Sequence, residues 1–206
     1  MRYIWINPVV DRMYDRSCLH LLLQKHGYLR VECRENWGQR VLKEYKRLAE
    51  SSQVPVADVR CPKVWKLLEE RYKGNGILIP AIEPILMHCA REIAGREELK
   101  GKAKVITTPC EILADIGNKA KLPETRFVSW KQFLLELGER LESEKLESSP
   151  IPPGFFQNLQ CLVVSITGED EVCSYLKNGD YGAARMIELL WCRDGCHHGD
   201  GVIDLE

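Results

Sequence analysis

Short apolar runs alternate along this chain with longer stretches in which apolar residues recur at helical spacing. The short runs predict strands at 3–7, 28–33, 54–59, 77–81, 103–108, 126–130, 161–167 and 187–191. This alternation is typical of strand–helix units around a mostly parallel sheet. Eight strands fit one large sheet or two smaller ones, and we favour the second arrangement. The predicted fold is therefore α/β, with two small lobes of mostly parallel sheet flanked by helices.

The stretches between the strands predict helices. "DRSCLHLLLQKHG" offers Asp15 or Ser17 as an N-cap and ends at Gly27. "NWGQRVLKEYKRLAES" and "SWKQFLLELGERLESEKL" place apolar residues at helical spacing and charges on the outer face. The Ser- and Pro-rich segment 147–156 predicts a linker or surface loop. We expect residues 1–206 to form a single two-lobed domain. If the terminal Leu205–Glu206 is a cloning remnant, that domain was excised from a larger protein.

Composition and charge narrow the class of protein. With 206 residues, 45% of them hydrophobic and 29% charged, the chain can bury a sizeable core. Its net charge is −1 and its charges are interspersed, which argues against nucleic-acid binding. The most apolar run, 77–89, is interrupted by Pro80, Glu83 and Pro84, and no signal peptide is evident. We therefore expect a cytoplasmic protein without a membrane span.

Nine cysteines stand out in such a composition, and the odd number argues against a complete disulfide framework. In a reducing compartment, thiols are kept more often for metals or redox chemistry. Cys61, Cys110 and Cys192 each follow a predicted strand. The carboxyl ends of parallel strands are where ligands bind, so these cysteines are expected to meet in one cleft.

Cys192 and Cys196 are spaced as i and i+4, which places both sulfurs on one face if the segment is helical. Gly195 and Gly199 would let the backbone approach a bulky inorganic ligand. Four thiolates suit either an iron–sulfur cluster or tetrahedral zinc. Zinc ligands usually come as two close pairs, whereas this set is one pair and two singles, which favours a cubane cluster.

Two alternatives stay open from the residues alone: a zinc site, and thiols that are simply buried as small apolar groups. The adjacent His197 and His198 are expected to be exposed and to lie outside the ligand set. The candidate cofactor and metal ligands are Cys61, Cys110, Cys192 and Cys196.

Three cysteine motifs, in order along the chain, resemble those of the iron–iron hydrogenases. "IELLWCRDGCHHGDG" is similar to the family's closing motif, Phe/Ile-Glu-x-Met-Ala-Cys-x-Gly-Gly-Cys-x-x-Gly-Gly-Gly. "TTPCEILADI" resembles its Met-Pro-Cys-x-x-Lys-Lys motif, and "DVRCPKVW" its Thr-Ser-Cys-Cys-Pro-x-Trp motif. "EPILM" resembles its Ser-Pro-Gln-Gln-Met stretch. The matching residues of the closing motif are Ile187, Glu188, Cys192, Gly195, Cys196, Gly199 and Gly201, with Asp194 and Asp200 in place of glycines.

The resemblance implies two α/β lobes with a 4Fe-4S cubane held in the cleft between them by the four cysteines named above. In that family the last of them, here Cys196, also bridges to a two-iron subsite. Departures from the family pattern argue against that subsite. Arg60 stands where the family has a proton-relay cysteine, and Leu113 stands in place of a lysine that contacts the two irons.

Further departures point the same way, because Ile85–Leu86 replaces a Gln-Gln pair and segment 147–156 replaces a Gly-Gly-Val-Met-Glu region. We therefore expect a 4Fe-4S-binding, hydrogenase-like domain with a redox, electron-transfer or sensory role, and no catalytic residue is assigned. Its expected partner is a redox or signalling protein, or a fused module of that kind.

Two alternative functions remain. One is an active hydrogenase-type enzyme, for which the candidate proton donors are Cys33, Glu35, His88 and Cys89. The other is a zinc-stabilised interaction domain.

Overall fold

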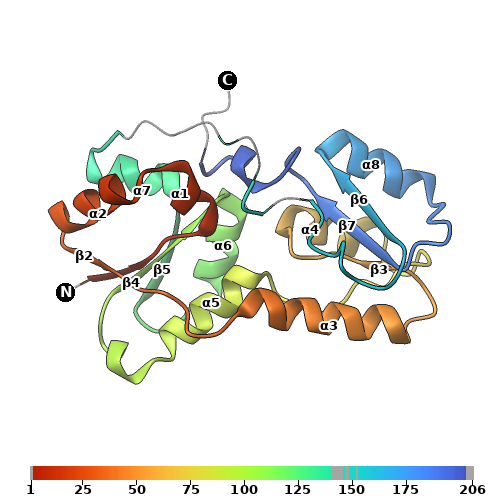
Figure 1. Cartoon of the computed structure of the whole chain (residues 1–206), viewed down its shortest axis with the longest axis horizontal. Coiled ribbons are helices and arrows are strands. Elements are labelled where there is room, and N and C mark those ends of the chain that lie inside the picture. The colour runs from red at the N-terminus through yellow and green to blue at the C-terminus, as the bar shows by residue number, and fades with distance from the viewer. Residues whose placement is uncertain (1, 141–145, 147–148, 152, 203–206) are drawn as a thin grey trace. The chain divides into compact units, whose positions relative to one another are not determined.

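The computed structural model describes residues 2–140, 146, 149–151 and 153–202, and the chain divides into two compact units (Figure 1). The first unit comprises residues 1–35, 86–151 and 196–206, and the second comprises 36–85 and 152–195. Each unit contains its own parallel sheet. Residues 141–145, within a predicted helix, and Leu205–Glu206 lie outside the described residues.

The first unit is built on a four-stranded parallel sheet of order β2-β1-β4-β5. Its strands are β1 (Arg2–Trp5), β2 (Tyr28–Arg30), β4 (Lys104–Thr108) and β5 (Thr125–Ser129). The register pairs Tyr3 with Leu29 on one side of β1 and Ile4 with Val105 on the other. Strand β4 is buried along its whole length, as expected for an inner strand of a parallel sheet.

The helices of the first unit are α1 (Pro8–Met13), α2 (Arg16–Lys25), α5 (Ile85–Ala94), α6 (Glu111–Lys119) and α7 (Trp130–Leu137), with short 3₁₀ turns η1 (Glu97–Leu99) and η2 (Cys196–His198). The predicted cap at Asp15 is confirmed, because its carboxylate accepts the backbone N–H groups of Ser17 and Cys18. Helix α7 stops at Gly138, which adopts a left-handed φ of 67°, so the helix predicted to continue beyond it is too long.

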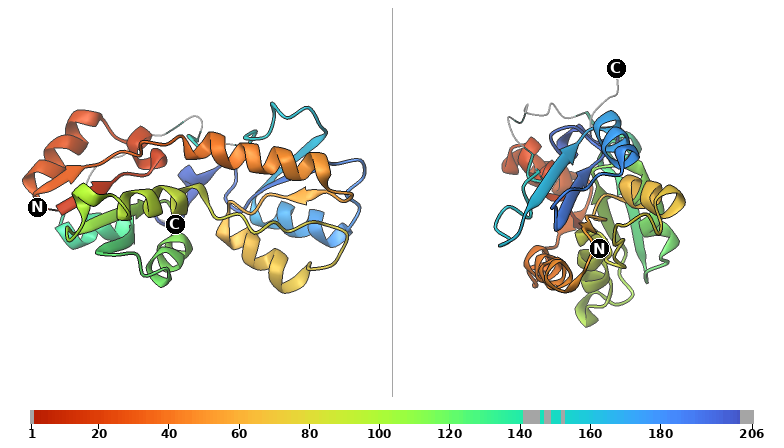
Figure 2. Two further views of the ribbon diagram at one scale, coloured as in Figure 1. Left: turned by 90° about the horizontal axis from the view of Figure 1, so that it is seen from below. Right: turned by 90° about the vertical axis from the view of Figure 1, so that its right-hand side faces the viewer.

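The second unit has a three-stranded parallel sheet of order β3-β7-β6. Its strands are β3 (Val56–Ala57), β6 (Val163–Thr167) and β7 (Met186–Leu190), and its helices are α3 (Trp37–Ser51), α4 (Pro62–Arg71) and α8 (Glu169–Asn178). Helix α3 covers one face of the sheet, and α4 and α8 cover the other (Figure 2). The central strand β7 is fully buried, and Tyr45 and Phe156 pack edge-to-face beside it at 5.0 Å.

The strand predicted at 77–81 is wrong. Only Leu78 forms a bridge, parallel to Val56, through bonds from the Leu78 N–H to the Pro55 carbonyl and from the Ala57 N–H to the Leu78 carbonyl. Pro80 has no N–H to extend this ladder.

The predicted fold class is confirmed at the level of two small, parallel sheets flanked by helices. Residues 147, 148 and 152 of the Pro-rich segment 147–156 lie outside the described residues. Its end is not a surface loop, because Phe156 is fully buried in the second unit and the N–H of Phe155 bonds to Glu188. Among the described residues, no helix combines the length and hydropathy needed to cross a bilayer.

Candidate functional site

Cys61 begins helix α4 in the second unit, one turn beyond β3, and Pro62 occupies the first helical position. The first N–H groups of a helix have no partner within it, so they are free to bond an acceptor at the cap. The Cys61 side chain makes no capping hydrogen bond of this kind, but the backbone N–H groups of Val64, Trp191 and Lys63 lower the pKa of its thiol. Burial raises the pKa of the Cys61 thiol, and these three N–H groups offset only part of that rise.

Cys192 follows Trp191, which is the first residue after the end of β7. Strands β3 and β7 are parallel neighbours, with Ala57 paired to Ile187, so their carboxyl ends lie at the same edge of the sheet. This pairing of neighbouring strands places the two cysteine-bearing segments side by side. The second unit therefore brings together the segments of two of the four predicted ligands.

The first unit brings together the segments of the other two, Cys110 and Cys196. Cys110 lies at the N-terminus of α6, directly after β4, and Cys196 opens the turn η2. The Gly201 N–H donates to the Pro109 carbonyl at 3.1 Å, and the Gly199 N–H donates to the Cys196 carbonyl at 3.1 Å. The α-helix predicted to join Cys192 and Cys196 is not formed. The residues between them form a non-helical turn, and Cys196 begins the 3₁₀ turn η2.

Two glycines allow the η2 segment to lie this close to Cys110. A Cβ atom on Gly199 would come within 2.2 Å of the Pro109 carbonyl oxygen. A Cβ atom on Gly201 would come within 2.9 Å of both the nitrogen and the Cα of Cys110. Neither approach is tolerated by a side chain, so these glycines are needed for packing against the cysteine turn.

Asp194 and Asp200, which stand at glycine positions of the hydrogenase motif that the sequence resembles, each have a local role. Asp200 accepts the Glu111 N–H through its Oδ1 at 3.0 Å and so caps the first turn of α6. Asp194 adopts a left-handed φ of 59°, a conformation that glycine occupies freely and aspartate tolerates better than most residues. Its N–H donates to the Thr167 hydroxyl at 3.2 Å. Position 194 thus has a backbone conformation that glycine favours, although the residue there is aspartate.

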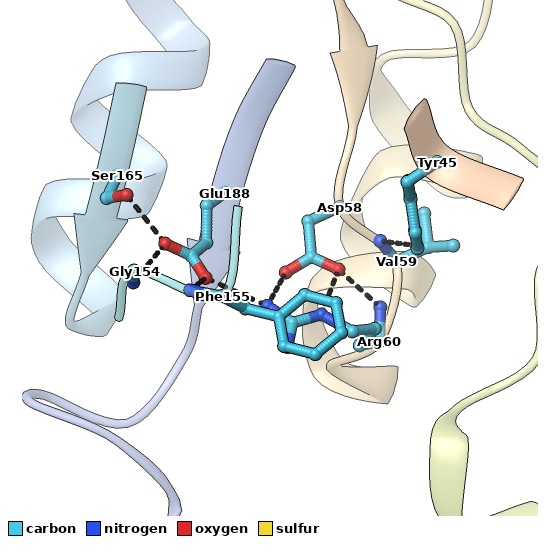
Figure 3. A network of polar contacts seen from close by, with 8 residues as sticks. All are labelled: Tyr45, Asp58, Val59, Arg60, Gly154, Phe155, Ser165 and Glu188. Atoms are coloured by element: carbon cyan, nitrogen blue, oxygen red, sulfur yellow. Dashed lines mark hydrogen bonds and ion pairs between the residues drawn. The ribbon is translucent and has the colours of Figure 1, made fainter. Parts of the chain in front are cut away.

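Arg60, the residue before Cys61, belongs to a buried network of charged side chains (Figure 3). The Arg60 guanidinium bonds Asp58 through Nε and Nη2 at 2.9 and 2.7 Å, and bonds Glu188 through Nη2 at 2.9 Å. Both carboxylates are 0% exposed. The Phe155 ring covers the guanidinium, with its centroid 3.9 Å from the Arg60 Cζ atom.

Backbone and hydroxyl groups complete this network. Glu188 accepts the N–H groups of Gly154 and Phe155 at 2.6 and 2.9 Å and the Ser165 hydroxyl at 2.6 Å. Burial lowers the pKa of Arg60, but the charge and hydrogen bonds of Asp58 and the charge of Glu188 outweigh it, so its pKa lies above the ordinary value. Arg60 is therefore a fixed, paired cation.

The Asp58–Arg60–Glu188 network was not predicted from the sequence. Its signal was present, because a single charged residue lies within each of two otherwise apolar strand segments, "VPVAD" and "MIELL". Such a residue, once buried, needs a partner of opposite charge. Arg60 was identified only as a replacement for a cysteine.

Other predicted positions are partly as expected. Leu113 and Ala114 are buried and apolar in α6. His198 is exposed, but His197 is buried and stacks on it with the ring centroids 3.9 Å apart, so the prediction that both are exposed is wrong for His197.

Each unit by itself contains two of the four predicted ligands: Cys110 and Cys196 in the first, Cys61 and Cys192 in the second. Within the described ranges, no group of three or more cysteine, histidine or carboxylate side chains is arranged to hold a metal ion. No protein-family model matches the chain, and no curated protein matches its sequence significantly.

Proposed function

We propose that this chain is a hydrogenase-like domain that binds a 4Fe-4S cluster through Cys61, Cys110, Cys192 and Cys196. The observation that supports the proposal is that each unit brings two of the four cysteine-bearing segments together. Parallel pairing of β3 with β7 brings the segments of Cys61 and Cys192 to one edge of the sheet in the second unit. In the first unit, the Gly201 N–H donates to the Pro109 carbonyl and so joins the segments of Cys110 and Cys196. The carboxyl ends of parallel strands are where such sheets bind ligands.

The packing around Cys110 also supports the proposal. Gly199 and Gly201 let the backbone of the η2 segment approach the Pro109–Cys110 turn without a clashing Cβ atom. A cysteine at a helix N-terminus that backbone approaches so closely suits a bulky inorganic ligand. The donor set of four soft thiolates also fits iron and sulfide.

We propose a redox or sensory role in place of hydrogen turnover. A bound 4Fe-4S cluster supplies one-electron transfer. Proton delivery needs a group that can release and regain a proton near neutral pH, and Arg60 stands where the family has its relay thiol. Because Asp58 and Glu188 hold the guanidinium charged, Arg60 cannot serve that purpose. The buried Leu113 likewise offers no donor where the family has a lysine.

The role is tested by spectroscopy and turnover on the same anaerobically reconstituted chain. We expect a broad charge-transfer absorbance band in the visible region and an electron paramagnetic resonance signal on reduction. After maturation, we expect no hydrogen evolution from reduced viologen. Robust hydrogen evolution would support the enzyme alternative, and a colourless chain containing zinc would support the zinc-stabilised interaction domain.

A further inference from the structure

A second pair of cysteines, separate from the four predicted ligands, lies in the first unit. Residues 32–35, which follow β2, are held against helix α5. The Glu92 carboxylate accepts the backbone N–H groups of Arg34 and Glu35 at 2.8 and 3.2 Å. Arg96 donates to the Glu32 carbonyl at 2.5 Å and also to Glu92. The loop is thus held by Glu92 on α5 and by Arg96, which lies between α5 and η1.

The bonds to Glu92 bring Cys33 against the part of α5 that carries Cys89, one turn before Glu92, and a hydrogen bond between the two thiols has the largest effect on the pKa of each. Cys89, Glu92 and Arg96 follow one another at spacings of three and four residues, so they share one face of this segment. Cys89 is 6% exposed, and Cys33 is half-buried and open to small solutes. The contact is therefore between one accessible thiol and one buried thiol.

The surroundings make the two thiols chemically unequal. The hydrogen bond with Cys89 lowers the pKa of Cys33, against the effects of burial and of the Glu92 and Glu32 charges, and Arg96 lowers it further. The same bond and burial raise the pKa of Cys89. The Arg96 Nε–H is buried and has no hydrogen-bond partner among the described residues, so it remains available to an anion. Cys33 is the better nucleophile, and Cys89 keeps its proton.

We propose that Cys33 and Cys89 form a redox-active dithiol that a peroxide oxidises to a disulfide. The Cys33 thiolate attacks one peroxide oxygen, and the O–O bond breaks to give a Cys33 sulfenic acid and a hydroxide, which takes up a proton. The Cys89 sulfur then attacks the Cys33 sulfur. The S–O bond breaks, and a second water leaves with the Cys89 proton. Two thiols and one hydrogen peroxide thus give one disulfide and two waters.

The position of the pair gives this disulfide a structural consequence. The chain passes from the first unit to the second between residues 35 and 36, and returns between 85 and 86. Cys33 and Cys89 lie just outside these two crossings. A bond between them closes a covalent loop that contains all of 36–85, including α3, β3 and α4. Such a loop restricts the unfolded chain, so oxidation is expected to raise the melting temperature.

The test is peptide mapping of the full chain, purified without oxygen and titrated with substoichiometric hydrogen peroxide. After alkylation and digestion, we expect a cross-linked Cys33–Cys89 peptide, two hydrogens lighter than its parts, to form before exposed Cys18 is modified. In Cys89→Ser, a dimedone adduct is expected on Cys33, and in Cys33→Ser none on Cys89. Equal reactivity of Cys18, or alkylation of both Cys33 and Cys89 after oxidation, would overturn the proposal.

This proposal does not depend on the cluster. In Cys196→Ser, which removes one of the proposed cluster ligands, the yield of the Cys33–Cys89 peptide is expected to be unchanged. Loss of the peptide in that variant would overturn the dithiol proposal, whatever its iron content.

Discussion

Replacing Arg60 by methionine is the sharpest perturbation of the buried network in the second unit. Methionine has a similar length and no charge, so the change leaves Asp58 and Glu188 in place without their cation. Both carboxylates are fully buried, and Arg60 donates to each of them. We expect a large loss of stability, since an unpaired buried charge costs far more than the pair contributes.

The size of the loss follows from the geometry. Breaking one partner of a buried ion pair costs about 3–5 kcal/mol. Two carboxylates share Arg60 here, although Glu188 keeps its bonds to Ser165 and to two backbone N–H groups, so the middle of that range applies. For a chain of this length each kcal/mol shifts the melting temperature by about 2–4 °C, so a loss of about 4 kcal/mol gives a fall of about 8–16 °C.

The assay is thermal and urea unfolding of the metal-free chain, followed by circular dichroism, with two controls. Lys73→Met breaks the exposed pair with Glu69, 3.0 Å apart, and should change stability by less than about 1 kcal/mol. The triple change Asp58→Asn, Arg60→Met and Glu188→Gln removes all three charges and should recover part of the loss. If Arg60→Met alone lowers the free energy of unfolding no more than Lys73→Met does, Asp58, Arg60 and Glu188 do not form the buried ion-pair network described above.

Two further predictions concern backbone packing and a buried hydroxyl. Gly199→Ala and Gly201→Ala should each cost about 1–3 kcal/mol and reduce the iron content, whereas Gly38→Ala, whose added Cβ meets its nearest neighbour at 3.5 Å, should be neutral or stabilising. Equal behaviour of the three variants would contradict the packing argument. Tyr45→Phe removes the acceptor of the Val59 N–H, 2.9 Å away, and should cost about 1–3 kcal/mol in urea unfolding. Because burial raises the pKa of Tyr45 well above its ordinary value, this variant should also leave the tyrosinate absorbance unchanged until alkaline unfolding.

The sequence was enough to predict the parallel α/β class, because strands buried on both faces produce short apolar runs. It was also enough for the Asp15 cap, whose chemistry is local to a few residues. The prediction failed at 77–81, where an apolar run contains Pro80 and forms one bridge. Hydropathy does not distinguish a paired strand from an apolar segment that crosses the core.

The candidate site was harder to predict because its contacts join segments far apart in the chain. The sequence predicts that Cys61 and Cys192 both follow strand ends, and the parallel pairing of β3 with β7 is the long-range contact that brings their segments together. Nothing in the spacing indicated that Arg60 is paired with Glu188, 128 residues away. Pairing of buried charges depends on which strands are neighbours, which a single sequence does not specify.

The most direct test of the central proposal is the iron and acid-labile sulfide content of the chain after anaerobic reconstitution. We predict about four irons and four sulfides per chain, falling sharply in Cys61→Ser and Cys110→Ser and unchanged in Cys18→Ser, whose thiol is exposed. Iron well below that stoichiometry, with the same value in all three variants, would contradict the cluster.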